Sequence, residues 1–223
     1  MDQTPAHEIA NATLLAQIPR DASKIIEFGC SSGALAREYK AINPDCHYVG
    51  VEIDNRYAQM ASRYCDQVLV ADLDAVGDDF FSQHTGYDCW IFGDVLEHLR
   101  DPWLMLERVR RVISEDGCVV ACIPNAQHWS VISRLLLGDF HYEESGLLDR
   151  THLRWFTRKT MSEMFQRTGY RVDTCVGRIV PSNNQGVIDK LTELASALNA
   201  SADEIRRDLS VIQFVFRVSP NCT

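Results

Sequence analysis

Several features that mark particular classes of protein are absent from this chain or scarce in it. Its eight cysteines form no C-x-x-C pair and it opens on polar residues rather than a secretory leader, so we expect no disulfide framework. No apolar run approaches the ~20 residues that cross a bilayer. The 22 basic residues face 31 acidic ones, and the net charge of −9 disfavours a broad nucleic-acid-binding surface. These absences predict a soluble, reduced, cytoplasmic protein without a nucleic-acid or membrane partner.

What the chain does contain is a regular alternation of strand-like and helix-like segments. A length of 223 residues suits one α/β domain, and no linker or internal repeat divides residues 1–223. Five βα units in series predict a parallel sheet with helices on both faces. The expected strands are residues 24–28, 48–52, 67–70, 87–92, 118–123, 170–180 and 211–218.

Two segments interrupt this alternation. Residues 139–156 form a polar, aromatic stretch that is too long for a simple connection, and we expect a substrate-side loop there. Residues 186–209 have helical spacing, with Ser201 and Glu204 placed as in a capping box. This second segment is predicted to be a helical insertion before the last strand. The sequence leaves open whether it covers the active site or a partner subunit.

The most informative stretch is residues 25–33, Ile-Ile-Glu-Phe-Gly-Cys-Ser-Ser-Gly, an apolar strand followed by a turn of small residues. Glycine in such a turn lets the backbone approach a ligand that a Cβ would exclude. Nineteen residues after Gly33 comes Glu52, at the end of the next apolar strand. An acid at about this distance binds ribose hydroxyls in nucleotide-binding folds. The pair predicts a nucleoside-containing cofactor at the carboxyl ends of parallel strands.

Five short motifs with recognisable patterns follow one another along the chain. They are Glu27–Gly33, Gly50–Asp54, Ala71–Leu73, Tyr87–Leu99 and Gly146–Thr157. Over about residues 20–180 the chain resembles the class I S-adenosylmethionine-dependent methyltransferases. It is most similar to the branch that includes ubiquinone-biosynthesis enzymes, and the fifth motif is similar to bacterial members associated with glycan or natural-product pathways. The resemblance implies a Rossmann-like, seven-stranded mixed sheet with an antiparallel last strand, and S-adenosyl-L-methionine as cofactor.

The same resemblance assigns cofactor contacts to residues at the strand ends. Glu52 would bond both ribose hydroxyls, and the backbone of Gly29 and Gly33 would approach the methionine part, although both glycines also suit a tight turn without a ligand. Many members have a third glycine where this chain has Ser31, which puts contact there in question. The predicted cofactor-binding residues are Glu27, Gly29, Cys30, Gly33, Glu52, Ile53, Asp72, Leu73, Asp94 and Val95.

Methyl transfer from a sulfonium is an in-line displacement, so alignment of the nucleophile with the methyl supplies most of the acceleration. A hydroxyl acceptor must also lose its proton, and histidine has the best-placed pKa for that task. His98 follows the fourth expected strand, and His152 lies in the long loop, three residues after Asp149. We predict His152, His98 and Asp149 as catalytic residues, the aspartate holding one imidazole nitrogen. A structural role for either histidine is the alternative.

The long loop and the segment before it also offer groups for a substrate. Arginines there would clamp a carboxylate or phosphate, or else pair with loop acids, and aromatic side chains would stack on a ring. The predicted substrate-binding residues are His128, Trp129, Tyr142, Arg150 and Arg154. No metal is predicted, because no zinc-type ligand spacing occurs and the adjacent Glu97 and His98 would point apart.

The sequence thus predicts an enzyme that moves a methyl group to a small polar acceptor, with a hydroxyl of a sugar or natural-product intermediate preferred. N- or C-methylation of a small metabolite, or a catalytically silent cofactor-binding subunit, are the alternatives. A nicotinamide oxidoreductase is disfavoured, because residues 29–33 lack the G-x-G-x-x-G spacing that receives a pyrophosphate. The acceptor and the oligomeric state, a homodimer included, stay open.

Overall fold

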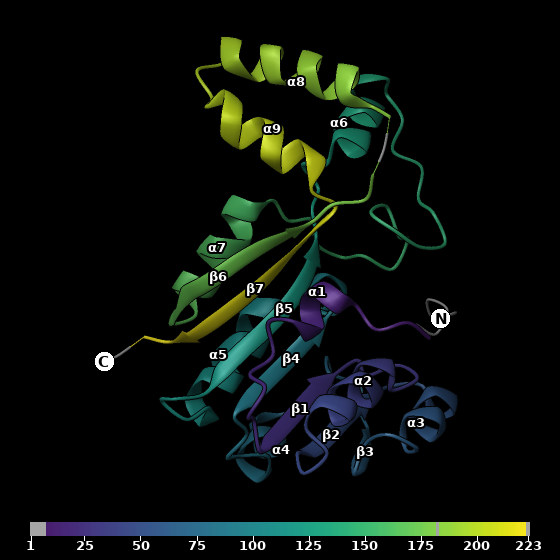
Figure 1. The fold of residues 1–223 in the computed structure, drawn as a ribbon, viewed down its shortest axis with the longest axis vertical. Coiled ribbons are helices and arrows are strands. Elements are labelled where there is room, and N and C mark those ends of the chain that lie inside the picture. The colour runs from purple at the N-terminus through teal and green to yellow at the C-terminus, as the bar shows by residue number, and fades with distance from the viewer. Residues whose placement is uncertain (1–7, 182, 222–223) are drawn as a thin grey trace.

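A seven-stranded mixed sheet forms the centre of the computed structural model, which describes residues 8–181 and 183–221 (Figure 1). The strand order is β3-β2-β1-β4-β5-β7-β6, in which the first five pair in parallel and β7 runs antiparallel to both β5 and β6. The strands are β1 (Lys24–Phe28), β2 (His47–Glu52), β3 (Gln67–Val70), β4 (Cys89–Gly93), β5 (Cys118–Pro124), β6 (Tyr170–Arg178) and β7 (Gln213–Pro220). The predicted mixed sheet with an antiparallel last strand is confirmed.

Helices cover both faces of the sheet, as the sequence predicts. Alternate residues of β1 enter two separate cores, since successive side chains of a strand point to opposite faces: Ile26 and Phe28 join one core and Ile25 the other. One face carries α4 (Asp78–Gln83), α5 (Pro102–Val112) and α7 (Arg158–Arg167), and the other carries α1 (Ala12–Leu15), α2 (Ala34–Ile42) and α3 (Asn55–Ala61).

Helix α4 begins with two acidic residues, Asp78 and Asp79. Its Phe81 is 1% exposed and packs in the same core as Phe28. Asp78 pairs with Arg108 and Arg111 of α5, at 2.9 and 3.1 Å. Acids in the first turn also suit a helix N-terminus. The helix therefore depends on one buried ring and on partners from α5, which are not visible in the local sequence.

The predicted insertion consists of two helices, α8 (Gln185–Ala197) and α9 (Ala202–Ser210), which lie with α6 (Trp129–Leu136) beyond the sheet (Figure 1). The three helices share a small core of their own, which contains Ile188, Leu191 and Leu209. The predicted capping box is wrong, because the Ser201 side chain makes no capping hydrogen bond. The Glu204 carboxylate turns instead toward Arg158 of α7, at 3.5 Å.

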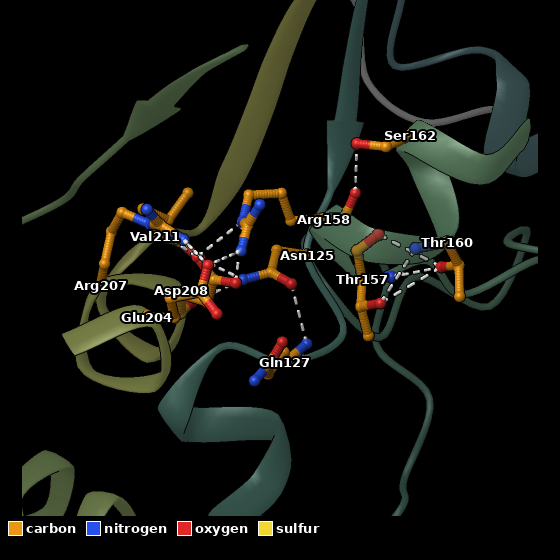
Figure 2. Close-up of polar contacts among 10 residues, drawn as sticks. All are labelled: Asn125, Gln127, Thr157, Arg158, Thr160, Ser162, Glu204, Arg207, Asp208 and Val211. Carbon is orange, nitrogen blue, oxygen red and sulfur yellow. Dashed lines mark hydrogen bonds and ion pairs between the residues drawn. The ribbon is translucent and has the colours of Figure 1, made fainter. Parts of the chain in front are cut away.

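A buried polar network fixes this helical pair to the sheet (Figure 2). Asn125 follows β5 and is fully buried; its amide donates to the carbonyls of Asp208 and Val211, at 2.7 and 2.8 Å, and its side-chain oxygen accepts from the Gln127 N–H. Arg158 donates to both carboxylate oxygens of Asp208, at 2.9 and 3.0 Å. Because buried polar groups are costly to leave unpaired, the network ties the end of α9 to β5 and α7. It also explains why β7 begins only at Gln213.

Residues 139–156 contain neither helix nor strand, yet they are anchored. Leu148 is 1% exposed and Phe156 4%, and Glu143 of the loop pairs with Arg134 of α6 at 2.7 Å. The short 3₁₀ helix η1 (Leu96–His98) follows β4 and receives the loop, as described below. Within the described residues, no helix has the length and apolar character needed to span a membrane.

Candidate active site

The predicted cofactor residues lie at the carboxyl ends of β1, β2, β3 and β4. Strand β1 pairs with β2 on one side and with β4 on the other, so the strand order reverses at this point. Open α/β sheets bind ligands in the crevice outside such a reversal. Two of the three described non-glycine residues with positive φ also lie here, Ser31 (48°) and Asp94 (56°). Strained backbone of this kind clusters at functional sites.

Glu52 ends β2 and is 5% exposed. Its Oε2 accepts the Ser31 N–H at 2.8 Å, and its Oε1 accepts the N–H groups of Ile53 and Asp54 at 2.8 and 3.0 Å. Each carboxylate oxygen accepts two hydrogen bonds, so Oε2 retains capacity for a ligand hydroxyl. Ile53 beside it is 49% exposed, an apolar surface beside an acid. This combination fits the ribose and purine of an adenosyl group.

The two glycines of the β1 turn are required by the protein itself. Both have positive φ, 68° at Gly29 and 80° at Gly33. A Cβ on Gly29 would lie 2.5 Å from Val95 Cγ2, and one on Gly33 would lie 2.9 Å from Ala61 Cα. The space in front of each glycine is thus filled by neighbouring segments. This supports the tight-turn interpretation, and contact of their backbone with a cofactor stays a prediction.

Glu27 is a buried acid at the other end of the same turn. The Tyr48 hydroxyl donates to its Oε2 at 2.9 Å. Burial raises the pKa of Glu27 to about 8, the Tyr48 hydrogen bond opposes this rise, and the Glu52 charge adds to it. Glu27 therefore carries a proton for much of the time near neutral pH.

The remaining predicted cofactor residues have diverse surroundings. The Cys30 thiol is buried with Leu35 in the α2 face of the core, which leaves only its backbone toward the crevice. Asp72 accepts the Asp74 N–H at 3.0 Å and is exposed, and Leu73 is partly buried. The Gln213 amide of β7 donates to Asp94 Oδ1. Nothing in the sequence marks Gln213 as a partner of this site.

A second cluster forms where the long loop meets η1. The Leu153 and Arg154 N–H groups donate to the Glu97 carbonyl, at 2.9 and 3.0 Å. This brings His152 against His98, with ring centroids 4.7 Å apart. Glu97 and His98 do not point apart as the sequence predicts, because the tight 3₁₀ turn and the docked loop place both side chains beside His152.

Asp149 reaches His98 through a third residue. Its Oδ1 accepts from the Thr151 N–H and from the Thr151 hydroxyl, at 2.7 and 2.6 Å. The Thr151 hydroxyl oxygen lies 3.0 Å from His98 Nδ1. Because the hydroxyl proton is given to Asp149, this network assigns the proton of the imidazole to Nδ1 and leaves Nε2 as its lone-pair nitrogen. Thr151 is a residue that the sequence analysis missed, although it stands between two predicted ones.

Glu97 is the second residue missed by the sequence analysis. It is 1% exposed, and neither carboxyl oxygen has a hydrogen-bond partner among the described residues. Burial, together with the charges of Asp94 and Asp149, raises its pKa well above the usual range. Burial and neighbouring His98 lower the pKa of His152 to about 4, and burial also lowers that of His98. Both imidazoles are therefore neutral at physiological pH.

The predicted substrate residues mostly serve other contacts in this structure. Arg150 pairs with Glu144 at 2.8 Å, and Arg154 donates to the backbone carbonyls of Arg100 and Leu153. His128 caps α6 through a contact with Ser130. Trp129 packs against the core that α8 and α9 share. Tyr142 is 58% exposed and lies beside Phe140 and Trp155. Arg150 thus makes the pairing with a loop acid that the sequence gives as the alternative, whereas Arg154 binds backbone carbonyls, and a substrate role for either stays a prediction.

The sheet order, the glycine-containing turn after β1 and the acid that ends β2 fit the Rossmann-like fold that the methyltransferase resemblance predicts. A family model described as a methyltransferase domain matches residues 3–174, and the chain belongs to this family. A comparison with curated proteins finds no match.

Solved structures share this fold at low sequence identity. An S-adenosylmethionine-dependent methyltransferase from Mesorhizobium loti has a TM-score of 0.61 at 16% identity, over 93% of this chain and 95% of its own. Mitomycin 7-O-methyltransferase has a TM-score of 0.58 at 13% identity, over 94% of this chain. An O-methyltransferase from neocarzinostatin biosynthesis, solved with S-adenosylmethionine and 2-hydroxy-5-methyl naphthoic acid, has a TM-score of 0.57 at 11% identity, over 93% of this chain. This chain spans about half of the last two, 53% and 52%.

Together the family match and the fold confirm the predicted methyltransferase class.

Proposed function

We propose that this protein transfers the methyl group of S-adenosylmethionine to a hydroxyl of a small polar acceptor, such as a sugar or natural-product intermediate. The observation that carries the proposal is the pair of neutral imidazoles, His98 and His152, at the same sheet edge as Glu52. A hydroxyl is a poor nucleophile until its proton is removed, whereas N- and C-acceptors need less help from a base. The acidic net charge favours a small acceptor over a nucleic acid.

The cofactor would be held by the β2 and β1 edges. Glu52 would accept ribose hydroxyls, Ile53 and Leu73 would contact the purine, and Asp94 would lie near the amino acid end. When bound, S-adenosylmethionine supplies an electrophilic methyl group on a cationic sulfur. The acids at this edge, Glu52 and Asp94, favour the charged cofactor before transfer.

His98 and His152 would remove the acceptor proton, and Asp149 would hold His98 in position through Thr151. Tyr142 and the aromatic side chains beside it are exposed, so they are available to a ring-shaped acceptor. A cytoplasmic location is part of the proposal, supported by six buried free cysteines among the described residues, which suit a reducing compartment.

The test is transfer of a labelled methyl group from S-adenosylmethionine into fractions of a small-metabolite pool. We expect the labelled methyl group to stay on its acceptor in mild base. A methyl ether is stable under these conditions, whereas a methyl ester is hydrolysed. His152→Ala should slow transfer far more than it weakens binding of S-adenosylhomocysteine. Label on nitrogen or carbon would support the alternative acceptors. Cofactor binding with no transfer into any pool would support a silent subunit.

A further inference from the structure

We infer that Glu97, His98 and His152 form a site for a divalent transition-metal cation such as Zn²⁺. One ligand atom from each residue lies within 4.8 Å of the other two. Two imidazoles and one carboxylate, with a fourth position left open, is a donor set that catalytic zinc sites use. The site is assembled from η1 and the long loop, which the paired N–H groups of Leu153 and Arg154 hold against the Glu97 carbonyl.

The side chain of Glu97 is the independent observation that points to a ligand. It is 1% exposed, and neither Oε1 nor Oε2 has a hydrogen-bond partner within the described part of the chain. A proton does not resolve this, since a protonated carboxyl adds an O–H donor that also needs an acceptor. His152 Nε2 is 4.0 Å from Oε1, too distant for a hydrogen bond. A cation between them satisfies both groups.

The imidazoles are set up as ligands by their other contacts. His98 Nδ1 lies 3.0 Å from the Thr151 hydroxyl, which itself donates to Asp149, so Nε2 of His98 is the lone-pair nitrogen. Metal-binding histidines commonly have their second nitrogen held by a carboxylate or a similar group. Here the carboxylate acts through one threonine. The His152 ring is likewise held by the backbone of Leu147.

The distances suit a cation after a small adjustment. Two ligand atoms on one tetrahedral zinc, each about 2.0–2.1 Å from it, lie about 3.3 Å apart. The observed 4.0 Å between Glu97 Oε1 and His152 Nε2 therefore has to close by less than an ångström, and the widest pair by about 1.5 Å. Side-chain rotation covers such a change.

This inference rests on the proposed function and gives the two histidines a different part in it, as ligands of a cation rather than as the base. An acceptor hydroxyl in the open fourth position would have its pKa lowered by the cation. Its O–H bond then breaks with the proton passing to water. The oxygen forms a bond to the methyl carbon, and the carbon–sulfur bond of the sulfonium breaks to leave S-adenosylhomocysteine. When the cation expands from four to five ligands, acceptors with a second oxygen beside the first, such as vicinal diols, are favoured because they chelate.

The experiment is titration of chelator-treated, untagged protein with Co²⁺, followed by visible absorption, and with Zn²⁺, followed by calorimetry. We expect one equivalent of either ion per chain and a cobalt absorption band typical of nitrogen and oxygen ligands in a four-coordinate site. Glu97→Gln and His152→Ala should each weaken Zn²⁺ binding by about a hundredfold or more. Thr151→Val should weaken it by about tenfold, because it loosens a ligand without removing one.

His47→Ala is the matched control, since His47 is half-exposed at the far end of β2 and should leave Zn²⁺ affinity unchanged. Calorimetry with S-adenosylhomocysteine shows that each variant is folded; if Glu97→Gln does not fold, Thr151→Val and His98→Ala carry the test. Wild-type protein that binds S-adenosylhomocysteine but no stoichiometric Zn²⁺ would overturn the inference. So would full methyl transfer in chelator-treated protein, and that result would leave the proposed function intact.

Discussion

Two buried glutamates at the carboxyl edge of the sheet are held in opposite ways. Glu52 accepts three backbone N–H groups, all from its own strand end and from the neighbouring β1 turn. Glu97 is buried more deeply, but its carboxyl oxygens have no partner among the described residues. Backbone N–H groups already hold the Glu52 carboxylate before any ligand arrives, and one accepting position on Oε2 is left for a ligand. The Glu97 carboxyl, in contrast, gains its partners only from what it binds. The end of β2 at Glu52 is therefore preformed for a cofactor. The cluster of Glu97, His98 and His152, in contrast, depends on a further group to complete it.

The largest expected effect lies in the incomplete cluster. His152→Ala should lower the rate of labelled methyl transfer by about a thousandfold, because it removes the group that assists loss of the acceptor proton, either as a base or as a ligand of the cation that lowers the hydroxyl pKa. Affinity for S-adenosylhomocysteine, measured by calorimetry, should change less than threefold. Equal losses in transfer rate and in S-adenosylhomocysteine affinity would show that the His152 cluster and the Glu52 edge do not act independently.

The second effect tests the preformed edge. Glu52→Ala should weaken S-adenosylhomocysteine binding by about a hundredfold, since hydrogen bonds to a charged group contribute about 1.5–3 kcal/mol each. Glu38→Ala is the control, because Glu38 lies half-exposed on α2, where it pairs with Arg37 at 2.9 Å. Unchanged affinity in Glu52→Ala would mean that the ribose assignment is wrong.

The third effect compares the two acids directly in metal-free, cofactor-free protein. Glu52→Leu should lower the free energy of unfolding by about 2–4 kcal/mol, because it orphans the N–H groups of Ser31, Ile53 and Asp54. Glu97→Leu should leave it unchanged or raise it by about 1 kcal/mol, because it removes a buried polar group that lacks a partner. Urea denaturation measures the free energy of unfolding of both variants. An equal decrease in Glu97→Leu and Glu52→Leu would show that the two carboxyl groups are held in the same way.

The smallest effect is a dependence of stability on pH at Glu27. Its folded-state pKa, about 8, lies above its ordinary value of 4.5, so folding favours the protonated form. The resulting stabilisation is full below pH 4.5 and is lost as the pH rises through about 8. Glu27→Gln should flatten this part of the profile, measured by urea denaturation between pH 5 and pH 8.5. An unaltered slope would indicate that another group causes it.

Buried histidines shape the acid side of the same profile. Burial lowers the pKa of His128 and of His152 to about 4. Folding therefore favours their neutral forms, and the stability they contribute is present above pH 6.5 and lost as the pH falls through 4. His128→Asn, which removes one of these groups but can retain a cap on α6, should reduce the loss on the acid side.

Most of the sheet could be predicted from the sequence, because strands β1 to β5 are short apolar runs ended by small or acidic residues. Helix α4 could not, since its stability depends on Phe81 and on arginines of α5. Of the site, Glu52 was identified by its spacing from Gly33. The Glu97 cluster was not, because two residues adjacent in sequence converge only in a 3₁₀ turn against which another loop is docked.

The sheet, the glycine turn and the acid that ends β2 can be predicted from short stretches of the chain, because hydrophobic periodicity and backbone φ preferences act over a few residues. The meeting of Glu97, His98 and His152, and the link from Asp149 to His98 through Thr151, arise only in the folded chain. Those contacts join segments about fifty residues apart, and the burial that leaves Glu97 without a partner exists only once the loop has folded onto the sheet edge.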